Sequence, residues 1–129
     1  MHQKNLELLK THIISNVAPI LVEKVPKEVF GNNSVILDAN IDKSYLNGHY
    51  EGINYLPPKW YENLEQNSIL IIDNLSHIPK QEQKKFIEIL KYRKISTFPL
   101  PEKCVVIITC DSLEKISEEI ISLVACIGE

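Results

Sequence analysis

The fold is decided by residues 68–74, which read Ser-Ile-Leu-Ile-Ile-Asp-Asn. Four consecutive apolar residues that end on an aspartate are typical of a short strand buried on both faces of a sheet. A helical stretch then begins at Pro79, and its inward face carries Phe86, Ile87, Ile89 and Leu90. This part of the chain therefore predicts a strand that leads into a helix.

Similar short apolar runs lie on either side of that unit. Residues 35–39 predict a second strand buried on both faces, and residues 104–108 predict a third, which ends at Thr109-Cys110-Asp111. Helical spacing of apolar residues predicts helices over about 5–15 and about 113–127. Strands that alternate with helices predict a small three-layer α/β domain, with a mostly parallel sheet of three or four strands.

Several segments are less regular. Residues 17–22 fit a buried strand, which we favour, or a first helix that continues past Pro19 with a kink. Pro26 begins a short helical turn that Gly31 ends. Residues 44–58 contain glycines and prolines and predict a loop, followed by one or two helical turns over 58–64. Residues 98–101 predict a turn held by prolines.

Composition limits the class of protein. The 129 residues, 44% of them hydrophobic, fit a single domain that spans 1–129. The net charge of −3 and a single arginine, Arg93, argue against a nucleic-acid partner. Apolar runs fall far short of the roughly 20 residues that a membrane span needs. With no signal-peptide pattern and no paired cysteine motif, we expect a soluble cytoplasmic protein without a membrane partner.

Polar residues follow each predicted strand, and in a parallel sheet such residues meet at the carboxyl edge, where ligands bind. Asp38, Asp73 with Asn74, and Thr109 with Asp111 hold these positions. Taken singly, each of them also fits the simple point where a buried strand reaches solvent.

The order and spacing of these segments, over about residues 35–127, resemble the middle of an AAA+ ATPase, with the MoxR-like and McrB-type branches nearest. In that family one strand ends in the Asp-Glu pair of Walker B, and the next ends in the Thr-x-Asn of sensor 1. The resemblance implies a truncated P-loop NTPase-like domain without the helical lid. It also implies that the vestiges of a nucleotide and magnesium site are Asp73, Asn74, Thr109 and Asp111.

The departures from the family pattern argue against catalysis. The phosphate-binding signature G-x-x-x-x-G-K-[ST] is absent, and if residues 20–22 are the first strand, residues 23–34 are too few for that loop and its helix. Asn74 stands where the family has its catalytic glutamate, and a carboxamide cannot accept a proton from water. Arg93 is not at the usual position of an arginine finger. We therefore expect a degenerate domain that is not an enzyme, has no catalytic residues and uses neither ATP nor magnesium.

Other sites receive little support. The four histidines show no metal-ligand spacing, so we expect no metal site. Five aromatic residues within a short segment either form a partner-binding surface or cover the edge of the sheet, and the sequence leaves both open. These residues are Tyr45, Tyr50, Tyr55, Trp60 and Tyr61.

The favoured hypothesis is a non-catalytic, AAA+-like interaction or regulatory module that binds protein. Its partners would be AAA+ ATPase subunits or further copies of itself. One alternative is a clamp-loader-like subunit without ATPase activity in a complex that acts on DNA. Another is a nucleotide-binding ATPase whose site is completed by a partner chain.

Overall fold

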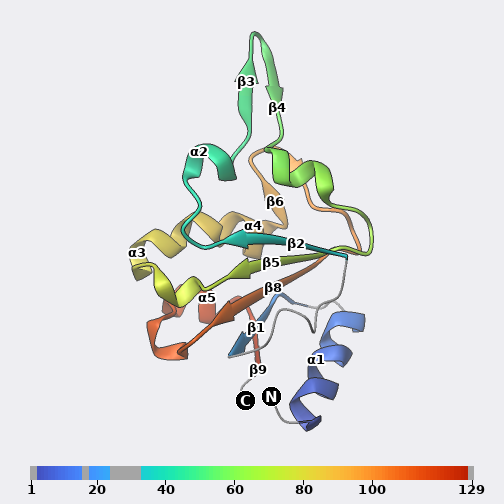
Figure 1. Cartoon of the computed structure of the whole chain (residues 1–129), viewed down its shortest axis with the longest axis vertical. Coiled ribbons are helices and arrows are strands. Elements are labelled where there is room, and N and C mark those ends of the chain that lie inside the picture. The colour runs from blue at the N-terminus through green and yellow to red at the C-terminus, as the bar shows by residue number, and fades with distance from the viewer. Residues whose placement is uncertain (1–2, 16–17, 24–32, 128–129) are drawn as a thin grey trace.

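The computed structural model describes residues 3–15, 18–23 and 33–127. Its centre is a five-stranded sheet in which all neighbouring strands are parallel, in the order β2-β5-β8-β1-β9 (Figure 1). The strands are β1 (Ile20–Glu23), β2 (Ser34–Asp38), β5 (Ile69–Asp73), β8 (Val105–Cys110) and β9 (Ala125–Ile127). The predicted small α/β domain with a parallel sheet is confirmed, although the sheet has five strands rather than three or four.

Alternate side chains of each inner strand point to opposite faces of the sheet and enter two separate cores. Leu70 and Ile72 of β5 join one core, while Ile71 joins the other. On the first face lie α4 (Ile87–Tyr92) and α5 (Glu118–Ile121), and on the second lies α1 (Gln3–Ser15), which buries Leu9. Because both faces need cover, the inner strands read as unbroken apolar runs, and the predicted three layers are present.

The helix predicted after Pro79 forms in three pieces: α3 (Lys80–Gln83), a 3-10 turn over Lys84–Phe86, and α4. Phe86, Ile89 and Leu90 are buried, as the helical spacing predicts. Other predicted helices also form: α1 covers the expected 5–15, and the turns over 58–64 form a 3-10 helix, η2 (Lys59–Asn63).

The helix predicted over 113–127 is wrong. The segment instead forms a 3-10 turn over Leu113–Lys115, the short helix α5, and the strand β9. The side chain of Ser117 caps α5 by accepting a hydrogen bond from the amide of Ile120. After α5, the chain pairs with β1, which gives β1 a parallel neighbour on each side. A short apolar run fits a helix or a strand, and here the open edge of β1 decides in favour of the strand.

The strand predicted over 35–39 forms as β2, but the expected burial on both faces is wrong. Strand β2 lies at the edge of the sheet and pairs only with β5. Ile36 consequently remains 49% exposed, whereas Leu37 is buried.

The loop predicted over 44–58 contains regular structure. It begins with α2 (Lys43–Leu46) and continues as an antiparallel hairpin, β3 (His49–Glu51) and β4 (Asn54–Leu56). We call residues 49–56 the arm, because in Figure 1 the hairpin projects away from the sheet. A second short hairpin, β6 (Lys94–Ile95) and β7 (Phe98–Pro99), replaces the turn predicted over 98–101.

A row of aromatic rings connects the arm to the core. Tyr50 packs on Tyr55 with ring centroids 4.8 Å apart, Tyr55 stacks on Phe98 at 5.6 Å, and Phe98 contacts Tyr61 at 5.8 Å. Tyr61 in turn meets the edge of the buried Trp60 at 6.2 Å. Such pairs stabilise beyond the area that they bury, so the arm is held firmly to the domain.

Two predictions fall on residues outside the described ranges: the start of the strand expected over 17–22 and the helical turn from Pro26 to Gly31. The part of the strand that is described, Ile20–Glu23, forms β1. No helix in the described parts of the chain has the length and apolar character needed to cross a bilayer.

Candidate functional site

The polar strand ends meet at one edge of the sheet, as predicted. The register places Asp38 of β2 beside Asp73 of β5, and Glu23 of β1 beside Cys110 of β8. The same edge carries Asn74 and Asp111, which directly follow β5 and β8. The pairing of β5 with β8 therefore brings together side chains that are 36 residues apart in the sequence, Asp73 and Thr109.

Asp73 is held by hydrogen bonds from within the chain. The Thr109 hydroxyl donates to Oδ1 of Asp73 at 2.7 Å, and the Asn74 side-chain amide donates to Oδ2 at 3.2 Å. The Thr109 oxygen in turn accepts from the backbone amide of Asn74 at 3.0 Å. Asp73 and Thr109 are buried, with exposed fractions of 4% and 6%. A buried carboxylate needs such donors, and here they fasten the ends of β5 and β8 together.

Asn74 has a left-handed backbone, with φ 62° and ψ 42°, as the chain leaves β5 for the 3-10 turn η3 (Leu75–His77). Asparagine tolerates this conformation better than most residues other than glycine. A glutamate at this position would have to adopt the same strained backbone. The residue therefore suits the turn, while its carboxamide lacks the basicity to activate water.

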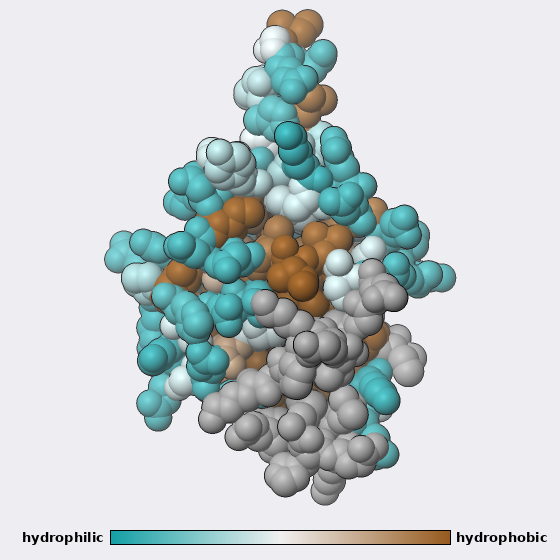
Figure 2. Space-filling model, in the orientation of Figure 1, coloured by the Kyte–Doolittle hydropathy of each residue, from teal (hydrophilic) through white to brown (hydrophobic). Residues whose placement is uncertain are grey.

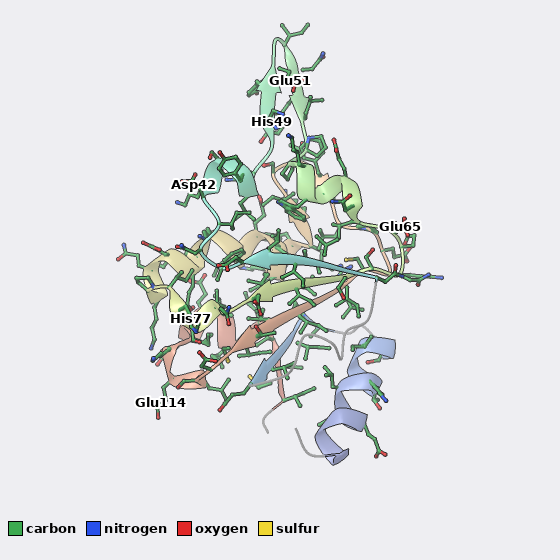
Figure 3. All side chains as sticks on the ribbon, in the orientation of Figure 1. Asp42, His49, Glu51, Glu65, His77 and Glu114 are labelled. Carbon is green, nitrogen blue, oxygen red and sulfur yellow. The ribbon has the colours of Figure 1, made fainter. Side chains whose placement is uncertain are left out.

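A second set of contacts joins the loops after β5 and β8. The backbone amide of Asp111 donates to the Ser76 hydroxyl at 2.9 Å, and the His77 Nε2 lies 2.6 Å from Oδ2 of Asp111. Figure 3 shows His77 at this edge of the sheet. Both side chains of the pair are more than half exposed, at 56% and 64%. The sequence analysis considered the histidines only as metal ligands and did not predict this pairing.

Gln83 is the structural residue at this edge that the sequence analysis missed. Its side chain is fully buried, and its Nε2 lies within hydrogen-bonding distance of the carbonyls of Leu75, Ile78 and Lys115. Its Oε1 accepts from the backbone amide of Ser117. One amide thus links η3, α3 and the start of α5. The only feature of the sequence that could have indicated this role is a polar residue on the inward face of the predicted helix.

Arg93 also has a structural position. It ends α4 in a left-handed conformation, with φ 54°, and its guanidinium donates to the carbonyls of Pro101, Glu102 and Cys104. These bonds hold the segment that leads into β8.

A polar hollow of about 580 Å³ lies beside the carboxyl edge, between the residues that follow β2 and the helix α3. Lys43, Lys84 and Lys85 line it together with Asp42 and Glu82, so the charges are mixed. Partial burial lowers the pKa of Lys85, whose Nζ donates to the Ile41 carbonyl at 2.6 Å. Hydrogen bonds from the backbone amide and hydroxyl of Ser44 lower the pKa of Asp42. Over residues 3–15, 18–23 and 33–127 no group of three His, Cys, Asp or Glu residues could hold a metal ion.

The five aromatic candidates for partner binding divide into two groups. Trp60 is buried and donates from Nε1 to the Leu46 carbonyl at 3.1 Å, and Tyr61 donates from its hydroxyl to the Pro99 carbonyl. Tyr55 is half-buried in the aromatic row. Tyr45 and Tyr50 are exposed, at 74% and 72%. The first three side chains have packing partners within the domain, and of the five only Tyr45 and Tyr50 expose most of their surface to solvent.

An apolar hollow of about 400 Å³ lies at the base of the arm. Ile41, Tyr45, Pro58 and Trp60 supply its apolar lining, and Lys59 is among its polar lining residues. In Figure 2 the tip of the arm is coloured as hydrophobic. The residue there is Ile53, which is 95% exposed.

The protein is a three-layer α/β domain with a parallel sheet, and the polar ends of its strands lie together at one edge of that sheet. No protein-family model matches the chain, and no curated protein sequence matches it. Solved structures do match. The chain is similar to NtrX from Brucella abortus, with a TM-score of 0.57 and 14% identity over 99% of this chain and 36% of NtrX.

It is also similar to RuvB from Thermotoga maritima. One RuvB mutant matches with a TM-score of 0.66 and 11% identity, over 100% of this chain and 46% of RuvB. A second matches with a TM-score of 0.62 and 12% identity, over 97% and 44%. The chain thus spans less than half the length of these proteins. At such low identity the likeness shows the fold alone, which is AAA+-like.

Proposed function

We propose that this chain is a degenerate AAA+-like module that hydrolyses no nucleotide and works by binding other protein subunits. The observation that carries the proposal is the state of Asp73. In the family that the sequence resembles, this aspartate helps to hold magnesium. Here both of its carboxylate oxygens accept hydrogen bonds from Thr109 and Asn74, within the domain itself. The carboxylate therefore stabilises the fold at the ends of β5 and β8.

The groups that would act on a phosphate also have other roles. Asn74 occupies the position of the general base but has no basic oxygen. The Arg93 guanidinium donates to three backbone carbonyls and would have to give up those bonds to reach a phosphate. Phosphoryl transfer depends on positioned charge and an aligned water molecule, and neither residue provides them.

The connection between β1 and β2 supports the same proposal. Only ten residues, 24–33, separate Glu23 from Ser34. A crossover connection between parallel strands usually takes about a dozen residues or more in total. A phosphate-binding loop followed by a long helix would need more still, and these ten residues contain a single glycine, Gly31.

Protein binding is supported by the arm, which exposes Tyr50 and Ile53. Tyrosine is a common anchor of interfaces, and an exposed apolar residue on a firmly held hairpin costs little entropy to bury. Partners that fit the resemblance are AAA+ ATPase subunits, which pack side by side, or further copies of this chain. Within that group we place the chain nearest the MoxR-like and McrB-type branches. We place it in the cytoplasm, where its three cysteines, none of them in a disulfide, stay reduced.

Thermal unfolding with and without nucleotide tests the proposal. A ligand at 100 times its dissociation constant stabilises the folded state by about 2.7 kcal/mol, which raises the midpoint by roughly 10 °C for a domain of this size. We expect no such rise for the wild-type chain in 1 mM Mg·ATP or Mg·ADP.

The matched variant is Asp73→Asn, which keeps the shape of the side chain and removes its charge. We expect it to be less stable than the wild type in buffer alone, because the Thr109 hydroxyl loses a charged acceptor. A nucleotide-dependent rise of several degrees in the wild type that is lost in Asp73→Asn would contradict the proposal. It would favour the alternative in which the chain binds nucleotide and a partner completes the site.

A further inference from the structure

The arm carries two complementary features at its opposite ends. At the tip, Ile53 is 95% exposed in a two-residue turn that Gly52 begins with a positive φ of 64°. At the base lies the apolar hollow of about 400 Å³, lined in part by Tyr45, Pro58 and Trp60. Burying an almost fully exposed isoleucine in an apolar hollow is favourable in water.

The tip cannot fill the hollow of its own chain. The strands β3 and β4 separate the two features, and three residues of strand span about 10 Å. The arm is also held in place. The aromatic row supports one side of it, and at Gly48 an added Cβ would lie 2.7 Å from the Leu56 carbonyl oxygen and 2.9 Å from the Phe98 ring. Only another molecule could therefore bury the tip and fill the hollow at the same time.

We propose that this molecule is a second copy of the chain, paired arm to arm about a two-fold axis. When two arms lie side by side and antiparallel, the tip of each meets the base of the other. Ile53 of each copy then enters the hollow of its neighbour, and both contacts form at once. Such an isologous contact closes at two copies and leaves neither tip exposed.

Charge complementarity favours a second copy as the occupant. Glu51 lies two residues before Ile53 and is exposed, and its only described ion pair is with His49 of the same strand at 3.6 Å (Figure 3). Lys59 lines the hollow, and Lys43 of α2 precedes the lining residue Ser44. In the antiparallel arrangement, Glu51 of one copy approaches Lys59 of the other. Opposite charges at the rim of an apolar contact steer association and set its register.

The backbone of the arm fits the same arrangement. The hairpin is a two-stranded sheet, so among the described residues the outer edges of β3 and β4 have no strand neighbour. All three residues of β3 are exposed. Edges of this kind pair readily with another strand, which adds backbone hydrogen bonds to the contact. This inference rests on the proposed function only in treating the arm as a protein-binding surface, and it is independent of nucleotide.

Sedimentation equilibrium of the full chain, from about 1 µM to 1 mM, tests the pairing. We expect a reversible monomer–dimer equilibrium. Ile53→Asp should weaken it by about 100- to 10,000-fold, the ratio that corresponds to losing the burial of two isoleucine side chains, one from each copy. The matched control is Leu8→Asp, a substitution of an isomeric residue that is 45% exposed on α1, at the opposite end of the molecule from the arm (Figure 1). It should leave the dimer unchanged.

A charge exchange checks the register. Glu51→Lys and Lys59→Glu should each weaken the dimer, and the double variant should recover most of the loss. A wild-type chain that stays monomeric up to 1 mM would overturn the pairing, as would a dimer that Ile53→Asp leaves intact. These results are separate from the nucleotide experiment. Nucleotide binding would contradict the proposed function whether or not the chain dimerises, and a monomer would contradict the pairing whether or not nucleotide binds.

Discussion

The substitution Thr109→Val isolates the hydrogen bonds that hold Asp73, because valine has nearly the shape of threonine and lacks only the hydroxyl. The variant loses a charge-assisted bond to the carboxylate, 2.7 Å long in the wild type, and a bond from the Asn74 amide, 3.0 Å long. Bonds to charged groups contribute about 1.5–3 kcal/mol, and an unsatisfied buried amide costs about 1–3 kcal/mol.

Two effects reduce the total. Asn74 is half-buried, so water can replace part of the lost bond at its amide, and the added methyl group of valine gains about 0.8 kcal/mol from burial. We expect Thr109→Val to lower the free energy of unfolding by about 2–3 kcal/mol, a large fraction of the 5–15 kcal/mol typical of a domain.

Urea unfolding followed by circular dichroism measures this change. With the slopes usual for small domains, the midpoint should fall by roughly 1–2 M. Thr97→Val is the matched control, because Thr97 is exposed in the turn between β6 and β7. It should change the stability by less than about 0.5 kcal/mol. If Thr109→Val were as stable as this control, Asp73 would not depend on Thr109, and the structural role that we assign to Asp73 would be refuted.

Four further predictions concern other parts of the fold. Gln83→Ala removes a buried amide with four backbone contacts and should lower the free energy of unfolding by about 2–4 kcal/mol. The control Gln81→Ala, at an exposed position, should lower it little, and equal unfolding midpoints for the two variants would exclude the bridging role of Gln83. Gly48→Ala should cost about 1–3 kcal/mol in a thermal melt, since its Cβ would collide with a backbone oxygen, and an unchanged midpoint would show that the base of the arm can open. At pH 8 a thiol reagent should label Cys126 before the other two cysteines, because Cys126 is exposed whereas Cys104 and Cys110 are buried. Burial raises the pKa of Cys126 as well, but it raises that of Cys110 to about 11. Because the pKa of Cys110 is higher in the folded than in the unfolded state, stability should fall as the pH rises from the unfolded pKa toward 11. The fall should be less steep in Cys110→Ala, and identical slopes for the two proteins would contradict this.

The central strands could be predicted because their sequences reflect burial on two faces. Strands β5 and β8 read as unbroken apolar runs, and each is covered on both sides. The same reasoning overestimated the burial of β2, because an edge strand and an inner strand have similar sequences. Strand β9 was mistaken for the end of a helix, since only the open edge of β1 distinguishes the two.

The arm and the site show a second limit. Glycines and prolines marked residues 44–58 as irregular, but the pairing of Tyr50 with Tyr55 depends on a turn of two residues that the sequence analysis did not recognise. The sequence placed Asp73 and Thr109 at one edge, and the strand order made them neighbours. It could not show that Thr109 would donate to Asp73, because that contact depends on the register of β5 against β8.

Calorimetric titration of Mg·ATP into the wild-type chain, with Asp73→Asn measured in parallel, tests the central claim most directly. If Asp73 serves the fold and not a magnesium ion, neither protein should bind with a dissociation constant below about 1 mM, which corresponds to about −4 kcal/mol. Micromolar binding by the wild type that disappears in Asp73→Asn would contradict the account, because the buried aspartate would then be a working part of a nucleotide site.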